Sequence, residues 1–150
     1  MTPHEPTIAQ IRLIVFALAA GLVIFGGVLL VLAQNEALPM AETSGGAMET
    51  LGWVAVLVAA TSVVLAFVVR GAVWRGAVGG RRDGEAPSPR ARYAQGALVF
   101  AALLEGGALL NLVAVMLVPS PWVNVGAAGV LLALMLATLP SEEQFDNLQV

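Results

Sequence analysis

The stretch Tyr93–Val118, YAQGALVFAALLEGGALLNLVAVMLV, decides the fold class of this chain. It carries a single charged side chain, Glu105, near its middle. An α-helix rises about 1.5 Å per residue, so roughly 20 mostly apolar residues cross the hydrocarbon layer of a membrane. The stretch is therefore predicted to be a transmembrane helix with a carboxyl group at mid-membrane depth.

Three other helix-length stretches contain no charged residue at all: Leu13–Ala33, Leu51–Val69 and Trp122–Leu139. The first is longer than the apolar part of a signal peptide, which is about 7–15 residues, so we predict a retained span. Only 11% of all residues are charged, 59% are hydrophobic, and the mean hydropathy is +0.88; soluble domains carry about 25% charged residues. The sequence thus predicts an all-α fold, a single membrane domain over residues 1–150 with four transmembrane helices in an antiparallel bundle.

Short sequence signals predict where these helices begin and end. Thr7 and Gln10 form a capping box before the first apolar stretch, and Thr50 can cap the second helix. Ser120, with Pro121 at the first helical position, is predicted to cap the fourth helix. The predicted spans cover residues 8–34, 50–70, 92–118 and 121–139, with an inner loop at residues 71–91 and a short polar helix or turn after Pro140.

The basic residues predict the direction of the spans. Arg12 precedes the first span, and the other six arginines lie between the second and the third, whereas the segment Gln34–Glu49 has three glutamates and no basic residue. Basic residues in short loops stay in the cytoplasm. We therefore predict a protein of the bacterial inner membrane whose N and C termini are cytoplasmic.

The two halves of the chain show a weak repeat. Val15-Phe16-Ala17 matches Val99-Phe100-Ala101 with an offset of 84 residues, and Trp53-Val54 matches Trp122-Val123 with an offset of 69. Helices rich in Ala, Val and Leu also match at this level without common ancestry. Two repeated hairpins and a chance match both remain open.

The arginines of the inner loop have two interpretations. They can contact anionic lipid head groups, at about 1 kcal/mol for each basic residue near the surface, or they can simply determine the orientation of the spans. The loop lacks aromatic residues between its charges, so no nucleic-acid partner is predicted. The candidate head-group ligands are Arg70, Arg75, Arg81, Arg82, Arg90 and Arg92.

Glu105 is the main candidate for a functional residue. A charged side chain at this depth costs about 2.5–3.5 kcal/mol, and the sequence places no Lys, His or Arg there, so we expect a buried, protonated carboxyl. Thr61 and Ser62 lie near the middle of the second span, and Asn111 lies on the same helix as Glu105. The candidate ion-binding set is therefore Glu105, Thr61, Ser62 and Asn111. Gly106 and Gly107 are expected to let another helix approach closely.

The segment Ala101–Met116, AALLEGGALLNLVAVM, resembles two families. Over this one helix it is similar to the proteolipid subunits of rotary ATP synthases, whose ion-carrying helix has the form A-x-x-E-A-x-x-x-x-x-L-V. Over most of the chain, including Pro140-Ser141-Glu142-Glu143, it resembles small bacterial four-span proteins of unassigned activity with an A-L-x-E-G motif in the third span. The first resemblance implies a proton or cation carried by Glu105, and the second implies a membrane protein without a stated activity.

Two functional hypotheses follow. The first is a non-enzymatic structural or accessory subunit in which Glu105 pins helix packing or a membrane protein partner, which includes a second copy of the chain. The second is a proton- or cation-translocating protein that uses Glu105 as its ion site. An enzyme, a metal site and a cofactor are not predicted, since the chain has no Cys, its one His is His4 in the N-terminal tail, and Ser62 has no base at its depth.

Overall fold

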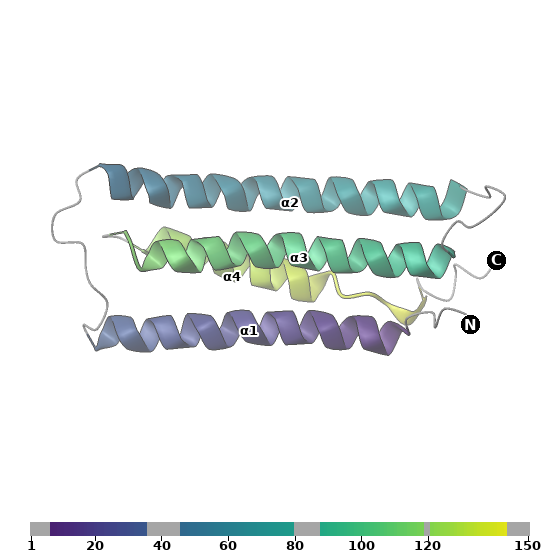
Figure 1. Ribbon diagram of the computed structural model, residues 1–150, viewed down its shortest axis with the longest axis horizontal. Helices are drawn as coiled ribbons and strands as arrows, with labels where there is room; N and C mark the ends of the chain where they lie inside the picture. Colours follow the sequence, from purple (N-terminus) through teal and green to yellow (C-terminus); the bar gives the residue numbers. More distant parts are fainter. Residues whose placement is uncertain (1–6, 36–45, 80–87, 119–120, 144–150) are drawn as a thin grey trace.

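The computed structural model describes residues 7–35, 46–79, 88–118 and 121–143 of the chain. These residues form four helices and, within these ranges, no strand, so the predicted all-α fold is confirmed (Figure 1). The helices are α1 (Ile8–Gln34), α2 (Ala47–Gly79), α3 (Pro89–Val115) and α4 (Trp122–Ala137).

The third helix is the centre of the bundle. In Figure 1, α1 and α2 lie on opposite sides of α3, and α4 packs across α3, where it also contacts both α1 and α2. Successive helices alternate in direction, so α1 and α3 run one way and α2 and α4 the other. We call the end where α1 and α3 begin the terminal end, and the end where α2 and α4 begin the loop end.

Three of the helices are long and apolar enough to cross a membrane. Their spanning segments are Ile8–Leu32, Glu49–Val73 and Pro89–Val115, with mean hydropathies of 2.8, 2.5 and 2.1. The fourth helix is apolar but has only 16 residues, which is about 24 Å at the usual helical rise. The predicted fourth span is therefore shorter than expected, because the helix ends at Ala137 rather than at Leu139.

The predicted cap of α1 is confirmed, and the predicted cap of α2 is wrong. The Thr7 backbone N–H donates to Gln10 Oε1 at 2.9 Å, and the Gln10 N–H donates to Thr7 Oγ1 at 3.3 Å, which is the predicted capping box. Thr50 is not a cap, because α2 already begins at Ala47 and the Thr50 hydroxyl donates to the Gly46 carbonyl at 2.7 Å. The predicted cap Ser120 lies outside the described residues.

The predicted loop at residues 71–91 is wrong at both ends. Helix α2 continues through Arg75 to Gly79, and α3 begins at Pro89 rather than at residue 92. Ser88 caps α3 by accepting a hydrogen bond from the Ala91 N–H at 3.1 Å, and proline is favourable in the first turn. The prediction failed because it ended each helix with its apolar run, although a helix continues past a membrane surface as readily as within it. After Pro140, Glu142 and Glu143 are helical as predicted, and the residues beyond them are outside the described part.

The two predicted hairpins do not pack alike. The helices α3 and α4 contact each other extensively, whereas α1 and α2 are separated by α3 (Figure 1). The first pair is therefore not a packed hairpin, and the repeat in the sequence has no counterpart in the arrangement of the helices. Whether the two halves share an ancestor stays a prediction.

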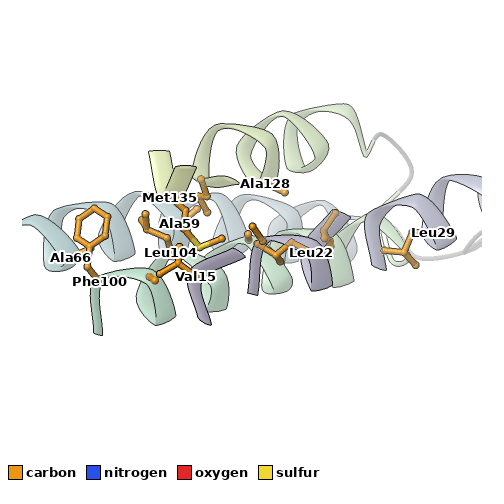
Figure 2. Packing of buried hydrophobic residues seen from close by; sticks show 14 residues of the cluster. Val15, Leu22, Leu29, Ala59, Ala66, Phe100, Leu104, Ala128 and Met135 are labelled. Atoms are coloured by element: carbon orange, nitrogen blue, oxygen red, sulfur yellow. The ribbon is translucent and has the colours of Figure 1, made fainter. Parts of the chain in front are cut away.

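The apolar core follows the inward face of α3. Figure 2 shows the cluster spread along the bundle, with Val15, Leu22 and Leu29 from α1, Ala59 and Ala66 from α2, Phe100 and Leu104 from α3, and Ala128 and Met135 from α4. The α2 side of this core is built from alanines, so the backbones of α2 and α3 approach closely. Close approach is how helices in lipid gain packing energy, because lipid tails compete equally for large apolar side chains.

Two glycines of α3 permit this approach. A Cβ added at Gly96 would lie 2.8 Å from Val73 Cγ1, and one added at Gly107 would lie 3.2 Å from Ser62 Oγ. The prediction for Gly107 is thus confirmed, whereas Gly106 is exposed and has open space around it.

At the terminal end, Arg12 ties α1 to the segment after α4. Its Nε donates to the Pro140 carbonyl at 2.9 Å, and its Nη1 lies 3.1 Å from Glu142 Oε1. Beside it, Ile11 packs with Tyr93 and Ala94 in a second small cluster. This end of α1 is therefore held by polar and apolar contacts together.

Replacing Gly96 with Ala should destabilise the bundle by about 1–3 kcal/mol, the usual effect of overpacking a tight site, because Val73 cannot move away without α2. The matched control is Gly106→Ala, which has free space and should leave stability unchanged or raise it by up to about 1 kcal/mol. Unfolding in mixed micelles measures both. Equal effects of the two variants would contradict the close approach of α2 and α3.

Candidate functional site

Glu105 lies at the edge of the buried face of α3. It precedes Leu112 by two helical turns, so the two side chains point within about 20° of each other. Leu112 is buried against α1, where a Cβ added at Gly26 would be 3.6 Å from Leu112 Cδ2. Glu105 itself is only partly buried. It therefore sits where the contact between α1 and α3 gives way to the outside of the bundle.

This position corrects the expectation of a fully buried carboxyl. The reason is geometric, since Ala108 and Leu112 belong to the buried side of α3, and Glu105 projects at the margin of that side. Among the residues that the structure describes, no hydrogen bond or ion pair involves Glu105.

The other predicted ion ligands are not gathered around Glu105. Thr61 is exposed on α2, and its hydroxyl donates to the Leu57 carbonyl of its own helix at 2.8 Å. Ser62 packs against Gly107, which points about 160° away from Glu105 around α3. The predicted set of four therefore does not form one site in the bundle.

Asn111, the fourth predicted ligand, belongs to a different polar site at the loop end. Its side chain is fully buried, and its Nδ2 donates to the Ala55 carbonyl of α2 at 3.0 Å and to the Gly107 carbonyl at 2.9 Å. Its Oδ1 accepts a hydrogen bond of 3.1 Å from Asn124 Nδ2, which also donates to the Gly52 carbonyl of α2 at 3.1 Å.

This pair of asparagines joins three helices through hydrogen bonds. Asn111 comes from α3 and Asn124 from α4, and both reach backbone carbonyls of α2. Interhelical hydrogen bonds in membranes are worth about 0.6 kcal/mol on average and up to about 1.7 kcal/mol. The network therefore adds little to the free energy of unfolding, and its main effect is to fix the relative positions of the three helices.

Sequence reasoning did not single out Asn124. A signal was present, because Asn111 lies four residues before the end of α3 and Asn124 two residues after the start of α4. Two polar amides flanking one short turn between antiparallel helices are expected to meet.

The six candidate lipid ligands fall into four groups. Arg70 lies over the Phe100 ring, with Cζ 5.3 Å from the ring centroid, which is a cation–π contact. Arg75 is exposed and donates from Nε to the Gly71 carbonyl at 3.2 Å. Arg90 and Arg92 are partly buried at the start of α3, and Arg81 and Arg82 lie outside the described residues.

Comparison with protein-family models, with curated proteins and with solved structures gave no match to this chain. Within the described ranges, no group of three or more His, Cys, Asp or Glu side chains could hold a metal ion. The resemblances drawn from the segment around Glu105 thus stay predictions.

The asparagine pair can be tested by a double-mutant cycle of Asn111→Ala and Asn124→Ala. Their shared hydrogen bond should give a coupling energy of about 0.6–1.7 kcal/mol in the free energy of unfolding. Asn35 provides the control, since its Nδ2 donates only to the Val31 carbonyl of its own helix. The cycle of Asn35→Ala with Asn124→Ala should show no coupling. A coupling near zero for the first pair would rule out the bond.

Proposed function

We propose that this chain is a non-enzymatic accessory protein of a bacterial inner membrane that binds a transmembrane helix of a partner protein. The observation that carries the proposal is Glu105, a carboxyl within a membrane-spanning helix that is partly exposed and has no bonding partner among the described residues. A polar side chain at that depth usually faces protein rather than lipid, because lipid offers it no partner.

An apolar groove begins about one helical turn beyond Glu105, at Ala108 of the same helix. Its volume is about 330 Å³, and it lies between α1, α3 and α4. Its walls include Gly26 and Gly27 of α1, Ala108 of α3 and Gly129 of α4. Ala108 is one turn beyond Glu105 on the same side of α3. Small residues of this kind let a further helix approach closely.

The groove and the carboxyl together specify the occupant. A partner helix with an apolar ridge would fill the groove, and a hydrogen-bond donor or a basic residue on that helix would meet Glu105. A donor or basic residue on the partner helix would offset part of the cost of placing the Glu105 carboxyl in the membrane, which is roughly 2.5–3.5 kcal/mol for a charged group at the centre of a span. We therefore expect a partner with one polar residue in an otherwise apolar span.

The orientation of the protein belongs to the same proposal. The described arginines lie at the terminal end, and the sequence between α1 and α2 is acidic, which supports cytoplasmic chain ends. Arg70, Arg75, Arg90 and Arg92 then lie at the inner membrane surface, within reach of anionic lipid head groups. The partner would meet Glu105 about halfway between the two surfaces.

The alternative of an ion carrier needs ligands around Glu105 that a single copy does not bring together. Thr61, Ser62 and Asn111 each serve other contacts, as described above. A carrier would have to complete its site from a second copy or another subunit. The partner experiment below therefore also tests this alternative.

A photo-reactive amino acid at Val23, an exposed residue of the groove, should crosslink in intact cells to one protein other than this chain. Glu105→Leu should lower the adduct yield about tenfold, because it removes an interhelical hydrogen bond worth about 1–2 kcal/mol. Glu105→Gln keeps a hydrogen-bonding side chain and should retain most of the adduct. The same probe at Val64, which is exposed on α2, is the matched control and should give no such adduct.

An adduct whose yield is unaffected by Glu105→Leu would contradict the proposal. An adduct that consists of two copies of this chain would show self-association instead of binding to a different protein. The ion-carrier alternative predicts a different pattern. Glu105→Gln would then abolish both carbodiimide labelling and ion flux, since an amide cannot release a proton.

The proposed orientation can be read from single-cysteine variants, because the chain has no cysteine of its own. Asn35→Cys at the loop end should react with a membrane-impermeant maleimide in intact cells, whereas Glu143→Cys at the terminal end should react only after permeabilisation. Both side chains are exposed, so reactivity reports the side of the membrane. The reverse pattern would invert the orientation.

A further inference from the structure

We infer that the loop end of the bundle holds a binding site for an organic ammonium group, formed by Glu49, Trp53 and Asn124. A cavity of about 340 Å³ opens there between the first turns of α2 and α4, on the far side of the asparagine pair from the apolar core. Its walls are Glu49, Gly52, Trp53, Val56, Val118, Val123 and Asn124.

Asn124 supplies a hydrogen-bond acceptor that no described residue uses. The side chain is only 3% exposed, and both of its Nδ2 hydrogens are committed, to the Gly52 carbonyl and to Asn111 Oδ1. Within the described part of the chain, Asn124 Oδ1 receives no hydrogen bond. A Cβ added at Gly52 would lie 3.4 Å from this oxygen, so the oxygen lies beside Gly52 in the wall of the cavity. This oxygen is open to the cavity rather than fully enclosed, so a ligand bound there can donate a hydrogen bond to it.

Glu49 and Trp53 give the cavity the character of a cation site. Glu49 is exposed in the first turn of α2 and lines the cavity with a carboxylate. Trp53, which is 56% exposed, adds an indole ring, and the face of an indole attracts ammonium groups more strongly than other aromatic rings do. The side chains of the cavity thus include two acceptors of hydrogen bonds and one aromatic ring, and none of them is basic.

The surrounding charge favours a cation over an anion. The N-termini of α2 and α4 both lie at this end and would by themselves favour an anion, with a partial positive charge of about one half each. Glu49 offsets them with a full negative charge, and none of the described side chains that line the cavity is basic. An ammonium group can therefore bond directly to the Glu49 carboxylate at the cavity.

The remaining walls define the rest of the ligand. Val56, Val118 and Val123 are apolar, and about 340 Å³ is at the small end of the range for ligand sites, roughly 300–1,000 Å³. A primary ammonium has three N–H donors, so it can bond Glu49 and Asn124 Oδ1 at once. The ligand is therefore a small amine with an apolar body, which can be a soluble amine or the ethanolamine head group of a lipid.

The test uses the full-length protein in nanodiscs of phosphatidylcholine and phosphatidylglycerol, titrated with phenethylammonium chloride by calorimetry against protein-free discs. We expect saturable binding that neutral 2-phenylethanol and anionic phenylacetate do not reproduce. Glu49→Gln should weaken it about tenfold, as the loss of one charged hydrogen bond does. Glu143→Gln, which makes the same charge change at an exposed residue of the terminal end, should leave binding unchanged.

A second variant tests whether the ligand occupies the cavity, without changing the charge of the protein. Val123→Trp adds bulk at a half-exposed position of the cavity wall and should abolish binding while the thermal transition of the protein stays in place. Adding phosphatidylethanolamine to the nanodiscs separates the two sources of the amine. A weaker apparent affinity for phenethylammonium identifies the lipid head group as a competitor, and an unchanged affinity identifies a soluble amine.

Three outcomes would overturn the site. These are the absence of saturable phenethylammonium binding to the unaltered protein, binding that survives both Glu49→Gln and Val123→Trp, and tighter binding of phenylacetate than of phenethylammonium.

Discussion

Close contact between α2 and α3 is the constraint on which the rest of the bundle depends. In lipid the helices gain little by burying large apolar side chains, so association rests on packing of small residues and on interhelical hydrogen bonds. Gly96 and Gly107 of α3 meet Val73 and Ser62 of α2 at distances that no larger residue would allow without a shift. Once α2 and α3 are this close, Asn111 can reach a backbone carbonyl of α2.

The position of the short helix α4 follows from that contact. Asn124 donates hydrogen bonds to Asn111 of α3 and to the Gly52 carbonyl of α2. It can make both bonds only at the distance between α2 and α3 that their close contact sets. The side-chain nitrogen and oxygen of Asn124 then have different roles. The Nδ2 donors hold α4 in place, and the Oδ1 acceptor remains for a ligand in the cavity at the loop end. By contrast, α1 is held at the terminal end by Arg12, an apolar groove remains between α1, α3 and α4, and Glu105 of α3 is partly exposed.

Much of the fold could be predicted because its signals are local. The four apolar runs, the Thr7 capping box and the mid-span position of Glu105 are properties of short segments. The length of α2 was missed because Arg70 was taken as the end of the helix, although the chain stays helical through Arg75 to Gly79. The proposed grouping of Glu105 with Thr61 and Ser62 failed for another reason. Residues at equal depth need not face each other, and rotation of a helix about its axis is set by packing.

The sequence by itself determined that this chain is helical and membrane-spanning, and that one carboxyl and two asparagines lie inside its apolar spans, because these are matters of composition and spacing. Only the tertiary structure decided that α3 is central, that α1 and α2 do not touch closely, and that the asparagines meet while Glu105 is left at an edge. The physical reason is that nearly uniform apolar faces of Ala, Val and Leu allow many rotations of each helix. Close glycine contacts and a few hydrogen bonds select one of them.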